Sequence, residues 1–304
     1  MTSKPSLRKV LYASYQTGES LPGYVRYALE GLCQTGFSVV YLTNERDLDA
    51  SSHAFLDSHH IELFFTENHG YDFGMWRRYI AYTAKFRREE WERLVLVNDS
   101  IVYYQNRFVK FFQTAEELPA DVVSLTSNEE QSPHLQSFFL YMKPEAITPF
   151  CERLLAEPEG ENFYDTVTRF EVGTSVALRE KGLTLDSIVH TPGPVLFSYP
   201  ELIEQKLGFV KRKFLQKRWT RGEAYFFWDH QAGNALLLDY PHWIREKGSP
   251  DRDFDLKWLC EPEQTLLQKL QDKIRFAYYK FRWKLSNAKA KMKSRSLSFF
   301  SGLL

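Results

Sequence analysis

Residues 9–15 read KVLYASY, residues 24–36 read YVRYALEGLCQTG, and residues 37–44 read FSVVYLTN. The first and third segments are short apolar runs typical of buried strands, and the middle one has the apolar spacing of a helix that ends at Gly36. A strand, a helix and a second strand within about 35 residues have the size of a βαβ crossover, which makes the two strands parallel. This stretch therefore predicts an α/β fold built on a parallel sheet.

The alternation continues along the chain and then loosens. We expect one globular domain over 1–262, with a nucleotide-binding-like half at about 1–130 and a mixed half at 131–262 that forms the other wall of a cleft. A separate tail occupies 263–304. The patterns predict strands at 61–68, 93–99, 121–127 and 134–143, and helices at 73–92, 144–156 and 163–181.

The composition is that of an ordinary soluble protein. Of 304 residues, 43% are hydrophobic and 26% are charged, with 24 Phe, 17 Tyr and 7 Trp, and aromatic rings both fill cores and stack on sugars or bases. The cysteines (Cys33, Cys151 and Cys260) lie far apart without metal-ligand spacing. They favour a reducing compartment over a disulfide framework or a zinc site. The sequence shows no signal peptide and no apolar run of about 20 residues, so a cytoplasmic location is expected.

A polar triplet, Asn98-Asp99-Ser100, follows the predicted strand at 93–99. In open α/β sheets, ligands bind outside the carboxyl ends of the strands. A carboxylate at such a position can hold a divalent cation or a sugar hydroxyl, and the flanking amide and hydroxyl add further polar contacts. The alternative is that Asp99 caps the next turn with help from Ser100. These residues alone leave both interpretations open.

The segment ENHGYDFGMW, residues 67–76, also follows a predicted strand. Gly70 and Gly74 allow a tight turn or a close approach of the backbone to a ligand, and a helix N-terminus beside glycines suits a phosphate group. Asp72 stands just ahead of the predicted helix, where an ordinary N-cap is the alternative role. The density of Asn, His, Tyr, Asp and Trp favours a functional segment.

Two later segments carry candidate polar groups. In the strand predicted at 134–143, alternation places His134 and Gln136 on one face and Ser137 on the other, although a lone histidine is more often structural. Glu171 lies in an apolar helical pattern that ends at Gly182. It is a candidate general base if it faces a cleft, and otherwise a surface glutamate paired with Arg169.

Together these segments resemble the rhamnan synthesis protein F family of glycosyltransferases. The resemblance covers roughly Lys9 to Gly182, and the segments occur in the family's order. It rests on NHGYDFGMW, LVNDSIVY, HLQSFFL and FEVGTSVALREKG. It implies a GT-A-like fold, with a Rossmann-like, mostly parallel sheet, and transfer of a sugar from a nucleotide sugar in bacterial cell-surface polysaccharide synthesis, such as that of lipopolysaccharide O-antigen.

The resemblance also implies roles for individual residues. Asp99 would take the place of the GT-A Asp-x-Asp motif at the diphosphate and a Mg²⁺ or Mn²⁺ ion, although this strand end has one carboxylate where that motif has two. Glu171 would be the catalytic base, with Asp72 as its rival. Asn68, Gly70, Tyr71, Asp72, Asn98, Asp99 and Ser100 would bind the donor, and His134, Gln136 and Ser137 would face the acceptor.

A literal Asp-x-Asp pattern occurs elsewhere, at Asp251, Asp253 and Asp255. It does not follow the fourth predicted strand but a Pro-containing loop near the end of the globular part. We therefore interpret it as a solvated loop or a helix cap.

The tail differs from the rest of the chain in charge. The whole chain is neutral, with 39 basic and 39 acidic residues, yet the segment from Leu266 onward is strongly basic. At helical spacing its apolar residues form one stripe, and its lysines lie on another side. This pattern predicts a helix in an anionic membrane interface. A coiled coil and a nucleic-acid arm are the alternatives, and nucleic acid is not an expected partner. The stripe contains Leu267, Leu270, Ile274, Tyr278, Phe281, Leu285, Ala288 and Met292.

We therefore expect an inverting glycosyltransferase, peripheral on the inner face of the cell membrane. It would transfer a sugar, with dTDP-rhamnose as the favoured donor, to a lipid-linked glycan. The alternative is a transferase-shaped module without catalysis that binds glycan or partner enzymes at the membrane, as the single carboxylate suggests. A methyltransferase on the same type of sheet is disfavoured, because the loop after the first strand lacks a Gly-rich cradle. The sequence leaves the oligomeric state open.

Overall fold

The computed structural model describes residues 7–216, except 88, 89, 130 and 192, and residues 265–285, except 268, 269, 272, 276, 279 and 283. The boundary predicted near residue 262 and the Asp251–Asp255 stretch lie outside the described residues.

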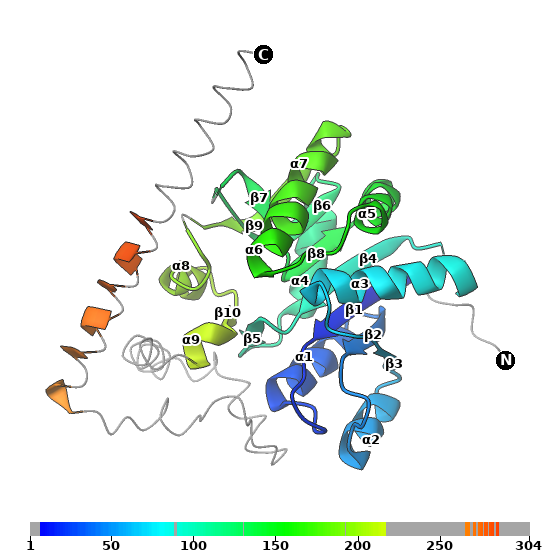
Figure 1. The fold of residues 1–304 in the computed structure, drawn as a ribbon, viewed down its shortest axis with the longest axis horizontal. Coiled ribbons are helices and arrows are strands. Elements are labelled where there is room, and N and C mark those ends of the chain that lie inside the picture. The colour runs from blue at the N-terminus through cyan, green and yellow to red at the C-terminus, as the bar shows by residue number, and fades with distance from the viewer. Residues whose placement is uncertain are drawn as a thin grey trace.

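The central sheet begins with the predicted parallel strands (Figure 1). In the order β3-β2-β1-β4, each neighbouring pair is parallel, which confirms the βαβ arrangement predicted from residues 9–44. The strands are β1 (Arg8–Ser14), β2 (Ser38–Thr43), β3 (Glu62–Phe65) and β4 (Arg93–Asn98).

The other half of the sheet is mixed. Beyond β4, β8 runs antiparallel to both β4 and β6, while β9 is parallel to β6 and β7 antiparallel to it. A second, two-stranded sheet pairs β5 with β10 in antiparallel fashion. These strands are β5 (Ile101–Tyr103), β6 (Val122–Asn128), β7 (His134–Leu135), β8 (Phe139–Met142), β9 (Leu185–His190) and β10 (Phe209–Lys211).

Helices cover both faces of the main sheet (Figure 1). Alternate residues of β1 enter different cores: Val10 and Tyr12 pack with α1 and α4, whereas Leu11 and Ala13 pack with α3, α5 and α7. This two-sided burial explains why the parallel strands are continuous apolar runs. The helices are α1 (Gly23–Cys33), α2 (Ala50–Ser58), α3 (Tyr71–Tyr82), α4 (Phe108–Glu117), α5 (Pro144–Ala156), α6 (Phe163–Thr166), α7 (Gly173–Glu180), α8 (Tyr199–Glu204) and α9 (Arg212–Gln216).

Several elements differ from the sequence prediction, and one of them is α4, which was not predicted. The helix predicted at 73–92 is shorter, because α3 gives way to a π-helical turn at Thr83–Arg87. The helix α2 was not predicted, since only Ser52 and Leu56 of its residues are buried and its apolar pattern is weak. The strand predicted at 134–143 is two strands, β7 and β8. They are interrupted where the amide of Ser137 donates to Glu171 and not to a neighbouring strand.

The helix predicted at 163–181 is helical throughout, but its middle is not α-helical. The residues Val167–Val172 between α6 and α7 form a π-helical turn that contains Glu171. Such turns are rare and are frequently found at functional sites. The helix ends before Gly182, which has a positive φ of 82° as a residue that follows a helix often does.

Candidate functional site

The polar triplet lies at the carboxyl end of β4, next to the carboxyl end of β1. Asp99 is the residue after β4, and its amide donates to the carbonyl of Ala13 in β1 (3.1 Å). This hydrogen bond fixes the triplet to β1. Asn98 and Asp99 are only 6% and 7% exposed. The predicted position at a strand end is therefore confirmed, and the two side chains are largely shielded from water.

The carboxylate of Asp99 accepts several hydrogen bonds at one oxygen. Its Oδ2 atom lies 3.1 Å from Ser14 Oγ, 3.4 Å from the Tyr24 hydroxyl and 2.9 Å from Nη1 of Arg212. Arg212 also donates to the Tyr24 hydroxyl. Asp99 is thus held in a buried ion pair with Arg212.

Asn98 takes the local capping role and also connects the triplet to α3. Its Oδ1 atom accepts hydrogen bonds from the amide of Ser100 (3.1 Å) and from Ser100 Oγ (2.6 Å). Its Nδ2 group donates to Oδ2 of Asp72 at the start of α3. The two sequence segments that were predicted to form one site therefore meet through the Asn98–Asp72 hydrogen bond.

Asp72 is a half-buried carboxyl group in the first turn of α3. Gly70, with φ of 72°, occupies the N-cap position that was the alternative role for Asp72. Burial raises the pKa of Asp72 to about 6, the Asn98 hydrogen bond opposes this shift, and the nearby charge of Glu171 adds to it. A carboxyl group with this pKa exchanges its proton close to neutral pH.

The loop before α3 is fixed by close backbone packing. A Cβ atom at Gly74 would lie 1.9 Å from the carbonyl oxygen of His69, so only glycine fits there. His69 and Arg78 both contact the carboxylate of Glu159. Of the expected donor-binding residues here, Asn68 is exposed and Gly70 is buried.

Tyr71 has an unusual backbone conformation for a residue with a side chain. Its φ is 57°, in the left-handed region, and its side chain is 40% exposed. Its ring meets the ring of Phe163, which is itself 60% exposed, edge to face at 6.0 Å. The start of α3 and the start of α6 thus present two aromatic rings to solvent.

Glu171 is bound from two directions. One oxygen accepts hydrogen bonds from Ser137 Oγ (2.5 Å) and the Ser137 amide (3.3 Å), and the other lies 3.4 Å from Nε2 of His134. Burial raises the pKa of Glu171, but the hydrogen bonds from His134 and Ser137 outweigh burial and hold it below its usual value. Arg169 pairs with Asp165 (2.5 Å), so the predicted alternative of an Arg169–Glu171 pair is wrong.

The hydrogen bonds of His134 assign its charge. Its Nδ1 atom lies 2.8 Å from the carbonyl oxygen of Ser132, which can only accept, so Nδ1 carries a proton. An attractive contact between Nε2 and the Glu171 carboxylate then requires a second proton on the ring. We therefore assign His134 and Glu171 as an imidazolium–carboxylate pair.

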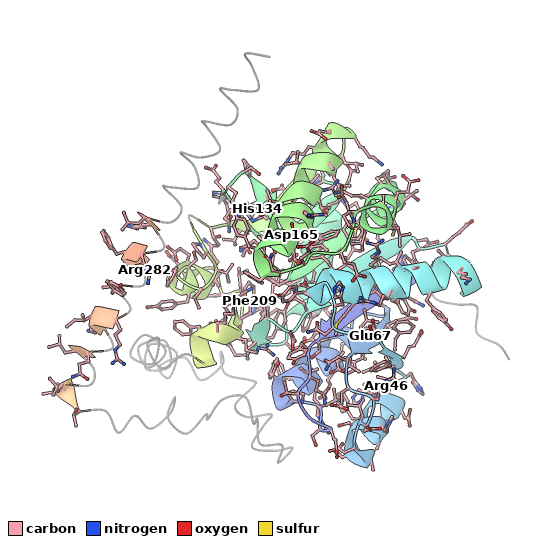
Figure 2. All side chains as sticks on the ribbon, viewed as in Figure 1. Arg46, Glu67, His134, Asp165, Phe209 and Arg282 are labelled. Atoms are coloured by element: carbon pink, nitrogen blue, oxygen red, sulfur yellow. The ribbon has the colours of Figure 1, made fainter. Side chains whose placement is uncertain are left out.

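The three residues expected on the acceptor side are buried. His134, Gln136 and Ser137 are 3%, 8% and 5% exposed. The side chain of Gln136 accepts from Thr126 Oγ1 (2.7 Å) on β6 and so stabilises the sheet, whereas His134 and Ser137 hold Glu171 in place. Figure 2 labels His134 on β7, Asp165 on α6 and Phe209 on β10, three of the elements around the site.

Lys211, the last residue of β10, and Arg212, the first residue of α9, were not among the predicted site residues. The amide of Arg212 donates to the carbonyl of Ser100 (2.8 Å), and Nζ of Lys211 donates to Ser100 Oγ (3.1 Å). Burial lowers the pKa of Lys211, while the charges of Glu171 and Asp72 oppose that shift. The sequence signal was the basic run VKRKFLQKRWTR at 210–221, but nothing in that run indicates that its start pairs with β5.

The residues at Asp99 do not fit the Mg²⁺ or Mn²⁺ ion that the GT-A resemblance implies. The position beside its carboxylate is taken by the Arg212 guanidinium, and Asp72 is bound by Asn98. Over the residues that the structure describes, no three His, Cys, Asp or Glu side chains gather as a metal-binding group.

Comparisons with known proteins come from a family model and from solved structures. The family model "Rhamnan synthesis protein F" matches residues 39–240, about two thirds of the chain. A cytidylyltransferase from Leptospira borgpetersenii serovar Hardjo-bovis (strain JB197) is 12% identical, with a TM-score of 0.39 and coverage of 86% of this chain and 99% of that chain. A 4-diphosphocytidyl-2C-methyl-D-erythritol synthase is 7% identical, with a TM-score of 0.40 and coverage of 64% and 91%. Because both identities and both TM-scores are low, neither structure bears on function. No curated protein matches significantly.

Proposed function

Because the chain belongs to the rhamnan synthesis protein F family, we propose that it is a GT-A-like glycosyltransferase. It transfers a sugar from a nucleotide-sugar donor, with dTDP-rhamnose favoured, to a hydroxyl group of a growing surface polysaccharide. The observation that carries this proposal is the pair of carboxyl groups, Asp72 and Glu171, beside the carboxyl end of β4. Their surroundings move their pKa values in opposite directions, which is the usual arrangement where one acid and one base have different tasks.

Of the two carboxyl groups, Asp72 is better suited to be the catalytic base. Both oxygens of Glu171 are engaged, one by Ser137 and one by the His134 imidazolium. The low pKa that results makes Glu171 a weak base. The pKa of about 6 at Asp72 is closer to the operating pH, where a general base is most efficient. We therefore assign proton abstraction to Asp72. Glu171 stays ionised, and its negative charge helps to raise the pKa of Asp72.

The proposed reaction is a single displacement at the anomeric carbon. Asp72 takes the proton of the acceptor hydroxyl as that oxygen bonds to the anomeric carbon, and the bond from that carbon to the diphosphate oxygen breaks. The bonding electrons leave with the nucleoside diphosphate, and the configuration inverts. A site that holds the base, the acceptor and the donor in the right geometry makes the reaction effectively unimolecular. This positioning removes an entropic cost and accelerates the reaction.

The first test is donor binding followed by turnover. The full chain is mixed with dTDP-rhamnose, UDP-glucose or GDP-mannose, and thermal unfolding is recorded, since a ligand that binds only the folded state raises the unfolding temperature. We expect dTDP-rhamnose to give the largest rise and, with a lipid-linked saccharide, to release dTDP. Binding without release across several acceptors would instead support the non-catalytic glycan-binding module.

We also propose that the tail attaches the enzyme to the cytoplasmic face of an anionic membrane, where a lipid-linked acceptor is found. The described residues of 266–285 are helical and exposed. Lys273, Arg275, Lys280, Arg282 and Lys284 accompany the apolar side chains, and such a combination suits a helix lying in an anionic interface. None of the helices that the structure describes is long and apolar enough to span a bilayer. The exposed apolar residues are Leu266, Leu267, Leu270, Ile274, Tyr278, Phe281 and Leu285.

Membrane attachment is tested with the double variant Leu270→Glu/Ile274→Glu of the full chain. Burial of each of these side chains contributes about 1.5–3 kcal/mol, so its binding to vesicles of anionic phospholipid should weaken by at least about tenfold. Val176→Glu, at a side chain that is 39% exposed on α7, is the control and should sediment with vesicles like the wild type. Equal sedimentation of all three proteins would show that the stripe is not the anchor.

A further inference from the structure

We propose that Lys211 and Arg212 form the binding site for the donor diphosphate and supply the positive charge that a divalent cation would otherwise supply at Asp99. This inference rests on the proposed transferase function. It predicts that sugar transfer does not require a metal ion.

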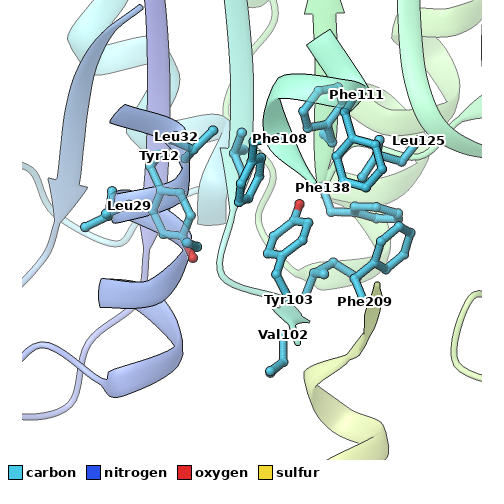
Figure 3. Close-up of a cluster of buried hydrophobic side chains, with 14 of the residues drawn as sticks. Tyr12, Leu29, Leu32, Val102, Tyr103, Phe108, Phe111, Leu125, Phe138 and Phe209 are labelled. Carbon is cyan, nitrogen blue, oxygen red and sulfur yellow. The ribbon is translucent and has the colours of Figure 1, made fainter. Parts of the chain in front are cut away.

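Lys211 and Arg212 stand on a rigid backbone. Phe209, at the start of β10, is fully buried, and its ring lies 5.6 Å from that of Phe138 and 5.8 Å from that of Tyr103 (Figure 3). Strand pairing places Lys211 opposite Ile101, the residue after the polar triplet. A functional group on an anchored strand is held more precisely than one on a free loop.

The two cations lie among groups that a diphosphate would otherwise avoid. The carboxylates of Asp72, Asp99 and Glu171 surround the carboxyl end of β4, and like charges close together are strongly unfavourable where water is excluded. The charge of Glu171 is already balanced by His134. Arg212 is paired with Asp99, and Lys211 lies near Asp72 and Glu171, so these two cations cancel carboxylate charge that would otherwise repel an incoming diphosphate.

The side chains of these two residues suit phosphate oxygens. Arg212 presents a planar guanidinium whose shape matches phosphate oxygens, and its contact with Asp99 fixes its position at the strand end. Lys211 offers a compact ammonium group, with its Nζ atom 5.3 Å from the centre of the Phe138 ring. Its contact with Ser100 leaves further N–H groups of the ammonium for a ligand, because a lysine has three donors.

A metal at Asp99 would compete with Arg212. A Mg²⁺ ion binds carboxylate oxygen at about 2.1 Å, and the guanidinium nitrogen already lies 2.9 Å from Oδ2. The two cations would repel each other, so an ion at Oδ2 would weaken or displace the contact of Arg212 with Asp99. In the proposed reaction, Lys211 and Arg212 instead stabilise the negative charge that develops on the diphosphate as its bond to the sugar breaks.

The first experiment compares turnover of the full chain in EDTA, in Mg²⁺ and in Mn²⁺. We expect equal rates in the three conditions within about twofold. Loss of activity in EDTA that Mn²⁺ or Mg²⁺ restores would overturn this inference while leaving the transferase function intact. Absence of donor binding and of turnover in every condition would refute the transferase function itself, and with it this inference.

The second experiment measures binding of dTDP and of thymidine by calorimetry. Lys211→Met should weaken dTDP binding by about 10- to 100-fold, because a hydrogen bond to a charged group is worth about 1.5–3 kcal/mol. It should leave thymidine binding unchanged. Arg212→Lys, which keeps the charge, should have a smaller effect. Lys206→Met, at an exposed lysine just before β10, is the matched control. An equal loss for dTDP and thymidine, or no loss for either, would overturn the assignment.

Discussion

Asp72→Asn is expected to lower sugar-transfer turnover by about 10²- to 10⁴-fold, the contribution of a well-placed general base. The amide keeps the size of the side chain and its oxygen can still accept from Asn98, but it cannot take up a proton. Donor binding measured by calorimetry should change little. Glu171→Gln is the matched comparison and should cost less, because Glu171 is already saturated by His134 and Ser137. The opposite ranking of the two variants would make Glu171 the base.

The pH dependence of kcat/KM of the wild-type enzyme is a second test of Asp72 as the base. A base acts only when it is deprotonated, so kcat/KM should fall tenfold per pH unit below about 6, the pKa to which burial raises Asp72.

The raised pKa of Asp72 also makes the stability of the folded protein depend on pH. Because the folded state binds the proton more tightly than the unfolded chain, stability falls as pH rises from about 4 to 6. Asp72→Asn should therefore be no less stable than wild type at pH 7, which separates lost catalysis from lost folding.

Phe209→Ala is expected to lower the free energy of unfolding by about 3–5 kcal/mol, the usual cost of deleting a large aromatic ring from a packed core. The ring is fully buried and contacts Tyr103, Phe111 and Phe138. Urea unfolding monitored by circular dichroism measures the change. Phe163→Ala, at a ring that is 60% exposed, should change stability by less than about 1 kcal/mol. A loss at Phe209 no larger than at Phe163 would mean that β10 is not anchored by its aromatic contacts.

The sequence predicts the first half of the fold well because its signals are local. The strands that are buried on both faces, and the amphipathic helix α1, can be recognised from short apolar patterns. The length of the connection between β1 and β2 indicates that these strands are parallel. The positions of Asn98, Asp99 and Asp72 follow in turn, since strand ends are local features as well. The helix α2 lacked such a signal because few of its residues face the core.

The rest of the site depends on contacts between distant segments. Nothing near Arg212 indicates a partner at Asp99, and nothing near His134 indicates that a π-helical turn brings Glu171 against it. These pairings follow from packing of the whole molecule. The hydrogen bond that Gln136 accepts from Thr126 shows the same limit, because alternation along a strand indicates a shared face and not a partner on another strand.

The pairing of β10 with β5 has a consequence for how the protein is made. The Lys211–Ser100 contact joins residues 111 positions apart in the chain. During synthesis the parallel strands β1 to β4 emerge first and can assemble, whereas β10 becomes available only after most of the described domain has left the ribosome. Closing so long a loop is slow and carries an entropic cost that later contacts must offset. We therefore expect the nascent chain to form its parallel strands before its cationic residues reach the strand ends, so that the site is completed last.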